Sequence, residues 1–193
     1  MFDAILITGG AGFIGQNLTH RLVNRKTRAK IVVLDALTYA ANPTSLEEHI
    51  RNGAITFAHG DITDLDFVRK LFVDYQFDAV FHLAAESHVD RSIAAPDKFI
   101  ETNVFGTHNL LKCALSEWTN HDRLHRCRFL HVSTDEVYGD LEPNERPFTE
   151  LSPYRPNSPY SASKAASDHL VRAYGRTYGM PVLVTNCSNN YGA

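Results

Sequence analysis

A tyrosine and a lysine four positions apart are side chains that could do chemistry together. Tyr160 and Lys164 stand near the start of a segment with a helical pattern, so this spacing places both side chains on one face. A cationic lysine beside a phenol lowers the phenol pKa, and we therefore expect Tyr160 to act as a base towards a substrate hydroxyl. Because this spacing is common, the pair predicts alcohol chemistry only if other residues support it.

Three polar residues that follow an apolar run at 129–133 provide that support. Thr134, Asp135 and Glu136 offer a hydroxyl, a potential acid and a potential base. The carboxyl ends of strands are where doubly wound folds bind their ligands. An acid and a base exceed what alcohol oxidation requires, so they indicate proton chemistry on a neighbouring carbon. The alternative is a capping loop with solvated carboxylates.

The elements that must position these residues alternate along the chain. Short apolar runs rich in β-branched residues predict strands at 4–8, 31–34, 55–58, 79–83, 129–133 and 182–185. Helical patterns lie between them at 13–25, 65–75, 97–118 and 159–178, the last with Ser158 as N-cap. This order predicts an α/β fold, a doubly wound parallel Rossmann sheet with helices on both faces. The irregular stretch 139–157 is expected to be a lid or substrate loop.

A glycine loop joins the first predicted strand to the first predicted helix. Gly9, Gly12 and Gly15 permit a tight turn, a close approach to a pyrophosphate and close helix–strand packing. Asp35, about 20 residues further on, can accept from both ribose hydroxyls and repels a 2′-phosphate, which favours NAD over NADP. Turn glycines beside a solvated carboxylate are the alternative interpretation.

Two other strand ends carry weaker indications of the same site. Asp61 and Ile62 follow the third strand, where an adenine would rest, and the small residues Ala84 and Ala85 follow Leu83 at the end of the fourth. Ordinary strand ends would explain either stretch equally well.

Composition restricts the function classes. The 193 residues, 44% hydrophobic and 21% charged, suit one globular domain over 1–193. A net charge of −3 gives no positive electrostatic field that would attract a nucleic-acid backbone, so nucleic-acid binding is not expected. Three cysteines without paired spacing indicate reduced thiols that serve in packing. The chain has no apolar run long enough to cross a bilayer and no signal peptide, so we expect a cytoplasmic protein that does not associate with a membrane. No metal site is expected, and His82 and His131 are interpreted as packing or surface residues.

Five stretches together resemble the dTDP-glucose 4,6-dehydratases, a family of extended short-chain dehydrogenase/reductases. The similarity extends through essentially the whole chain, and several of the stretches are individually diagnostic. They are the glycine loop, residues 83–92 (LAAESHVDRS), 133–139 (STDEVYG), 160–168 (YSASKAASD) and 186–192 (NCSNNYG).

The resemblance implies a carbon–oxygen lyase of deoxysugar biosynthesis that uses bound NAD as a hydride store. Tyr160 would take the proton of the C4 hydroxyl as hydride leaves C4, Glu136 would remove the C5 proton, and Asp135 would protonate the departing 6-hydroxyl. The hydride would return to C6, giving dTDP-4-keto-6-deoxyglucose. Thr134 would bond the sugar near O4, and Lys164 would bind the nicotinamide ribose.

The resemblance also implies the remaining contacts. Ser87, Thr134 and Asn189 would contact substrate. Besides the glycines, Tyr160 and Lys164, the residues implied at the cofactor are Phe13, Ile14, Asp35, Ala36, Leu37, Thr38, Asp61, Ile62, Leu83, Ala84, Ala85, Glu86, Ser87, Thr102 and Asn190. His88, Asp90 and Arg91 would either shape the substrate pocket or fix their loop. Helices 97–118 and 159–178 would form a homodimer.

Related enzymes and a non-enzymatic function remain alternatives. A 4-epimerase generally has small residues at positions 135 and 136, a decarboxylase typically has Ser at 135, and GDP-mannose 4,6-dehydratase uses NADP, which Asp35 opposes. An NAD-binding module without catalysis is the other class. Because the family continues well beyond this length, we expect an N-terminal portion without the C-terminal substrate domain, able to bind NAD but not to turn over dTDP-glucose.

Overall fold

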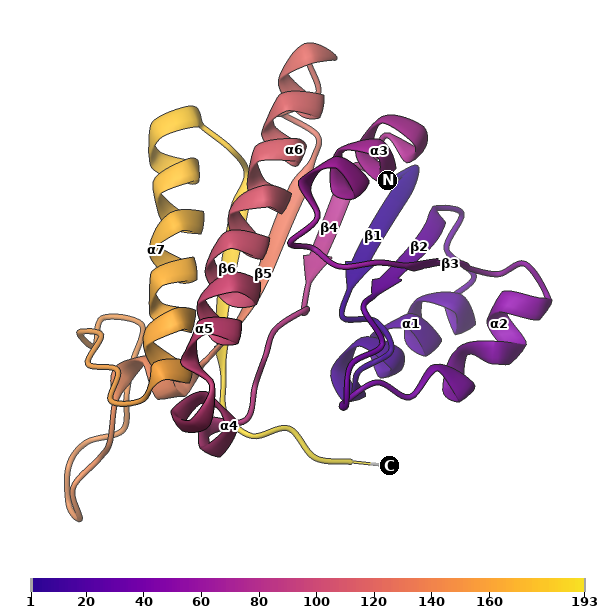
Figure 1. Ribbon diagram of the computed structural model, residues 1–193. Helices are drawn as coiled ribbons and strands as arrows, with labels where there is room; N and C mark the ends of the chain where they lie inside the picture. Colours follow the sequence, from indigo (N-terminus) through magenta and orange to yellow (C-terminus); the bar gives the residue numbers. More distant parts are fainter. Residues whose placement is uncertain (1, 193) are drawn as a thin grey trace.

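The computed structural model describes residues 2–192, and its centre is a six-stranded sheet in which every pairing is parallel. The strand order is β3-β2-β1-β4-β5-β6, so the chain builds one half of the sheet outward from β1 and then returns to build the other from β4 (Figure 1). The predicted strands are confirmed to within two residues at their ends, the least certain part of any assignment. The strands are β1 (Ala4–Thr8), β2 (Lys30–Asp35), β3 (Thr56–His59), β4 (Ala79–His82), β5 (Arg128–Thr134) and β6 (Val182–Cys187).

Helices cover both faces of the sheet, as predicted. On one face α1 (Phe13–Asn24) and the 3₁₀ turn Pro43–Leu46, which leads into α2 (Glu47–Arg51), pack on alternate residues of β1 and β2 such as Ile7. On the other face α3 (Leu65–Tyr75), α6 (Thr107–Asn120) and α7 (Pro159–Tyr178) bury the larger core around Trp118 and Phe72. Strands apolar on both faces require this double cover. Within residues 2–192, no helix is both long and apolar enough to cross a membrane.

The helix expected at 97–118 is confirmed as a continuous helical run, but it is not a regular α-helix. α5 (Pro96–Phe99) passes directly into a π-helical segment, Ile100–Gly106, and then into α6, and the separate short helix α4 (Val89–Ala94) precedes it. Asn103 in the π-helical segment turns its side chain inward to the loop after β4, and the Thr107 hydroxyl donates to the Asn103 carbonyl at 2.6 Å. A wide turn of this kind places one side chain where a regular helix would not.

α7 begins and ends as its sequence predicts. Ser158 caps it, since its hydroxyl accepts from the Ser161 N–H while the Ser161 hydroxyl accepts from the Ser158 N–H, both at 3.0 Å. Pro159 occupies the first position, and Gly179 ends the helix with a φ of +65°. Residues 139–157, all of them described, form neither helix nor strand, which confirms the irregular stretch.

Candidate functional site

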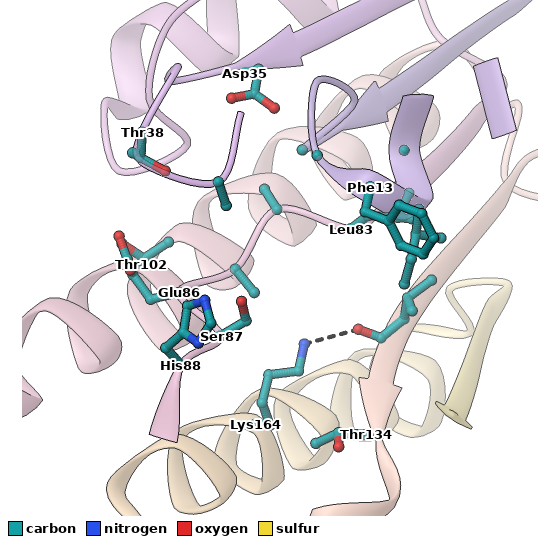
Figure 2. A pocket seen from close by; sticks show the side chains of 18 of the residues that line it. Phe13, Asp35, Thr38, Leu83, Glu86, Ser87, His88, Thr102, Thr134 and Lys164 are labelled. Carbon is teal, nitrogen blue, oxygen red and sulfur yellow. Dashed lines mark hydrogen bonds between the residues drawn. The ribbon is translucent and has the colours of Figure 1, made fainter. Parts of the chain in front are cut away.

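The carboxyl ends of all six strands meet at one cavity of about 570 Å³, shown from close by in Figure 2. It lies over the seam between β1 and β4, where the chain reverses its direction across the sheet. This is the position at which open parallel sheets bind their ligands. The cavity collects most of the side chains that the sequence singled out. Its walls include Gly9, Gly12, Phe13, Ile14, Gly15, Asp35, Ala36, Thr38, Asp61, Ile62, Leu83, Ala84, Ala85, Ser87, Thr102, Thr134, Glu136, Tyr160, Lys164, Asn189 and Asn190.

The glycine loop is packed so closely that side chains are excluded. Gly9 has a φ of +66°, its N–H donates to the Leu34 carbonyl at 2.8 Å, and an added Cβ would lie 2.6 Å from the Ala84 nitrogen. A Cβ on Gly15 would overlap the Gly9 carbonyl oxygen. The loop therefore brings the first turn of α1, with its free N–H groups, to the cavity wall, where it can receive a phosphate.

Asp35 closes the cavity at the end of β2. Its Oδ2 accepts from the Ala11 N–H at 2.9 Å, and its Oδ1 accepts from the Leu37 N–H at 2.8 Å. The second bond holds Leu37 at a φ of +54°, an unusual conformation for a side chain of this size. Each carboxylate oxygen has a second lone pair, so the fixed carboxylate can still accept from the hydroxyls of a ribose.

The opposite end of the cavity holds the candidate acid–base groups. β5 ends at Thr134, whose hydroxyl accepts from the Glu136 N–H at 3.2 Å and so starts the 3₁₀ turn Asp135–Tyr138. The first two turns of α7 bring Tyr160 and Lys164 to the same wall. Figure 2 shows the Lys164 ammonium at the cavity, where it donates to the Val132 carbonyl at 2.9 Å.

Burial, rather than the neighbouring lysine, controls the phenol. Desolvation and the negative charge of Glu136 raise the pKa of Tyr160 to about 12, against which the hydrogen bond from Thr134 acts. The direction is opposite to the lowering expected from Lys164. Desolvation also lowers the pKa of Lys164 to about 8, and burial together with two neighbouring carboxylates raises the pKa of Glu136. A raised carboxyl pKa suits a group that exchanges protons near neutral pH.

Two expected site residues lie outside the cavity wall. Leu37 acts through its backbone at Asp35, and Asp135 lies beside Thr134 with its Oδ1 3.5 Å from the threonine hydroxyl. Conversely, several wall residues were not expected. They are Leu34, Ala40, Ala41, Gly60, Lys98, Val132, Ser133, Cys187 and Ser188, whereas Glu86 and His88, also in the wall, were among the expected residues. Most adjoin predicted residues, and Lys98 could have been found because it precedes Thr102 by one helical turn.

Buried polar side chains tie the two ends of the site together. Asn103 accepts from the Glu86 N–H at 2.8 Å and donates both to the Glu86 carbonyl at 3.0 Å and to the Ser163 hydroxyl at 2.8 Å. The loop after β4 is thus joined to the helix that carries Tyr160 and Lys164. His82, as expected, is a packing residue, 1% exposed.

Arg91 belongs to a contact between two loops. Its guanidinium lies 3.8 Å from the centre of the Tyr39 ring, and the His88 ring lies 5.4 Å from the same ring. Tyr39 follows β2, whereas His88 and Arg91 follow β4, so the contact joins the loops after these two strands. Of the two roles expected for His88 and Arg91, these contacts favour fixing the loop.

Comparison with known proteins gives a consistent result. The family model described as GDP-mannose 4,6 dehydratase matches residues 6–193. The dTDP-glucose 4,6-dehydratase of Haemophilus influenzae is 54% identical over 191 residues, which cover 98% of this chain and 56% of that protein. The dTDP-glucose 4,6-dehydratase of Xanthomonas campestris is 57% identical over 192 residues, which cover 97% of this chain and 53% of that protein. The crystal structure of DesIV, a dTDP-glucose 4,6-dehydratase from Streptomyces venezuelae with NAD bound, has a TM-score of 0.88 at 46% identity and covers 98% of this chain and 56% of that one.

This chain therefore spans about half the length of the relatives it matches. With a doubly wound sheet, a cavity at its switch point and a match over nearly all its residues, the chain belongs to the GDP-mannose 4,6-dehydratase family.

Proposed function

We propose that this chain is the NAD-binding and catalytic part of a dTDP-glucose 4,6-dehydratase. The observation that carries the proposal is that one cavity holds a dinucleotide cradle at one end and Thr134, Glu136, Tyr160 and Lys164 at the other. A cofactor that extends from Asp35 would bring its reactive end towards these four side chains.

The residues present fit NAD. The glycine loop admits no Cβ at Gly9 or Gly15, which leaves the backbone free to approach a pyrophosphate, and the Asp35 carboxylate suits a ribose with both hydroxyls free. When bound, NAD supplies a hydride acceptor, a positive ring charge that favours the Tyr160 phenolate, and, once reduced, the hydride that returns to the sugar. Lys164 would donate to the nicotinamide ribose.

The side chains divide the proton transfers between them. Tyr160 takes the C4 hydroxyl proton while Thr134 bonds the same oxygen, and the ketone that forms acidifies the C5 proton. Glu136 removes that proton, and Asp135 protonates the 6-hydroxyl, which leaves as water. C6 then receives the hydride and C5 regains a proton, so the net change is loss of one water. Ser87 and Asn189, at the cavity wall, are proposed substrate contacts.

The choice of substrate rests on the relatives. The two curated relatives compared above, at 54% and 57% identity, are named dTDP-glucose 4,6-dehydratases. The acid and base at Asp135 and Glu136 favour a dehydratase over an epimerase, which needs only the hydroxyl, the phenol and the lysine.

The reaction is tested with Glu136→Gln in the complete gene product. With dTDP-glucose in deuterated water, the variant should still reduce its bound NAD, seen by nicotinamide absorbance, but lose C5 deuterium exchange. Glu145→Gln is the control, because Glu145 is exposed on the loop and contacts only the Glu142 N–H. Exchange at the wild-type rate in the Glu136 variant would refute the assignment of the base. Absence of a 4-keto-6-deoxy product from dTDP-glucose with the wild type would refute the proposed function.

We also propose that two copies pair through helices 97–118 and 159–178. The groove between α6 and α7 is lined by His108, Leu115, Tyr174 and Tyr178, among others, and Phe105 beside it is 58% exposed. Sedimentation velocity at micromolar concentration should show a dimer, and a monomer alone would refute this. The reduced thiols support a cytoplasmic location, which cell fractionation tests.

A further inference from the structure

A carboxylate buried beneath the site has no place in the proposed reaction. Asp168 is fully buried, one helical turn beyond Lys164 on α7, and it does not line the cavity. The Tyr154 hydroxyl donates to its Oδ2 at 2.8 Å, the Asn186 amide donates to the same atom at 3.2 Å, and His131 Nε2 lies 3.1 Å from Oδ1. A buried carboxylate is costly unless its partners compensate for lost hydration.

The surroundings keep this carboxylate ionised. Burial acts to raise the pKa of Asp168, but the neighbouring His131, Ser133 and Tyr154 side chains outweigh it, so the pKa lies below its usual value. The site therefore contains a permanent negative charge behind its cavity wall. A charge in such a poorly hydrated interior acts over a longer distance than a surface charge.

Lys164 is the nearby group that needs this charge. Its side chain is 3% exposed, and its ammonium group has the Val132 carbonyl as its hydrogen-bond acceptor at 2.9 Å. Desolvation lowers the pKa of Lys164 to about 8, and Asp168 is the larger of the two neighbouring influences that raise it. Loss of the Asp168 charge would bring the Lys164 pKa closer to neutrality.

A second connection leads from Asp168 to the end of β5. The Asn186 amide that donates to Asp168 also lies 3.2 Å from the Thr134 carbonyl, to which it donates, and Asn186 Oδ1 accepts from the Tyr138 hydroxyl at 3.3 Å. Asp168 thus contacts, through one intermediate, the residue that begins the acid–base turn.

We propose that Asp168 is a positioning residue that acts through its neighbours: its carboxylate holds Lys164 as an ammonium ion at the cavity, and through Asn186 it fixes the backbone of Thr134. The inference rests on the proposed function for the meaning of the Lys164 charge, because that charge would bind the nicotinamide ribose.

Other titratable groups surround Lys164, and they must be separated from Asp168. They are Tyr160 on α7, His131 on β5, His82 on β4, Glu136 on the 3₁₀ turn and Cys187 on β6. Burial lowers the pKa of His131 to about 4 and that of His82 well below its usual value, so both imidazoles are neutral near pH 7. Cys187 is the second group that raises the pKa of Lys164, and Cys187→Ser is therefore one control.

The direct test measures the titration of Lys164 in the chain without cofactor. Lysine labelled with ¹³C at Cε is followed by NMR from about pH 6 to about pH 11, with the Lys164 signal assigned by Lys164→Arg. In Asp168→Asn, which keeps the shape of the side chain, the midpoint should fall by about one pH unit or more. If this variant does not fold, Asp168→Ser provides a second uncharged side chain with room for a water. An unchanged midpoint would overturn the proposal.

A matched variant separates charge from structure. Tyr154→Phe removes one hydrogen bond to the carboxylate but keeps its charge, so the Lys164 midpoint should stay near that of the wild type. Cys187→Ser should shift it less than Asp168→Asn does. An equal shift in Tyr154→Phe and Asp168→Asn would show general loosening of the site and would overturn the proposal.

NAD affinity measured by calorimetry across pH gives the second measurement. In the wild type, affinity should weaken as pH rises through about 8, because Lys164 then loses its proton. In Asp168→Asn the weakening should begin at a lower pH, giving about fivefold weaker binding at the wild-type midpoint for a shift of about one pH unit, and a smaller difference in acid. Equal weakening at every pH would overturn the proposal. A lowered NMR midpoint with pH-independent NAD binding in both proteins would support it and would instead refute the proposed contact of Lys164 with NAD.

Discussion

Replacing Asp35 with asparagine removes a bond that the fold cannot replace. Both carboxylate oxygens accept from backbone N–H groups, those of Ala11 and Leu37, whereas an asparagine side chain has one accepting oxygen. One N–H must then face an amide N–H₂ group. A buried donor without a partner costs about 1–3 kcal/mol, so the free energy of unfolding should fall by about that amount.

Asp64→Asn is the matched control. Asp64 caps α3 through a single bond, from the Phe67 N–H to Oδ1 at 3.0 Å, and asparagine caps a helix as well as aspartate does. Urea denaturation should show a change within about 0.5 kcal/mol for this variant. Calorimetry should show that Asp35→Asn also weakens NAD binding and narrows the preference for NAD over NADP. Equal losses of stability in the two variants would refute the reasoning.

Three further predictions follow from individual contacts. Gly15→Ala should lower the free energy of unfolding by about 1–3 kcal/mol and abolish NAD binding, because the added Cβ would overlap the backbone of the glycine loop. In Gly12→Ala the added Cβ would meet only one atom, at 3.2 Å, so this variant should lose less stability. Equal unfolding midpoints of the two variants in urea would contradict this. An aromatic disulfide reagent should label Cys187 alone in the native protein, because Cys113 and Cys127 are buried and burial raises the pKa of the Cys127 thiol to about 11. Since Cys187 lines the cavity, bound NAD should slow its labelling. Labelling of Cys127 before Cys187 would contradict this. The pKa of His131 is about 4 in the folded chain and about 6.5 in the unfolded chain, so the neutral imidazole contributes its full stability above about pH 6.5. As the pH falls from about 6.5 towards 4, the free energy of unfolding should decrease by up to about 3 kcal/mol. His131→Gln should flatten this part of the pH–stability curve measured in urea.

The sequence predicted the strands, the principal helices and most of the cavity wall because these depend on local patterns. The glycine loop between a strand and a helix and the cap at Ser158 are each defined by neighbouring residues, and each agrees with the predicted order of elements. The π-helical segment within 97–118 was not predictable, because the inward turn of Asn103 is stabilised by residues from α7 and from the loop after β4. A helical period carries no information about such distant partners.

The Tyr160 pKa was missed for a related reason. The i, i+4 spacing places Lys164 near the phenol, but it does not show how deeply both groups are buried. In the structure desolvation is the largest influence on the pKa of the Tyr160 phenol and on that of the Lys164 ammonium. Burial is a property of the whole fold, so the spacing of Tyr160 and Lys164 alone predicted the wrong direction for the shift of the Tyr160 pKa.

The position of the cavity over the seam between β1 and β4 also affects how the protein folds and lasts in the cell. Residues before β4 form one half-sheet and those from β4 onward form the other, so a dinucleotide bound across the seam would touch both halves. A ligand that binds only the joined halves stabilises the folded chain by about 2.7 kcal/mol at a free concentration one hundred times its dissociation constant. Bound cofactor would thereby hold the two half-sheets in the folded arrangement, and the lifetime of the folded chain would depend on the concentration of free NAD.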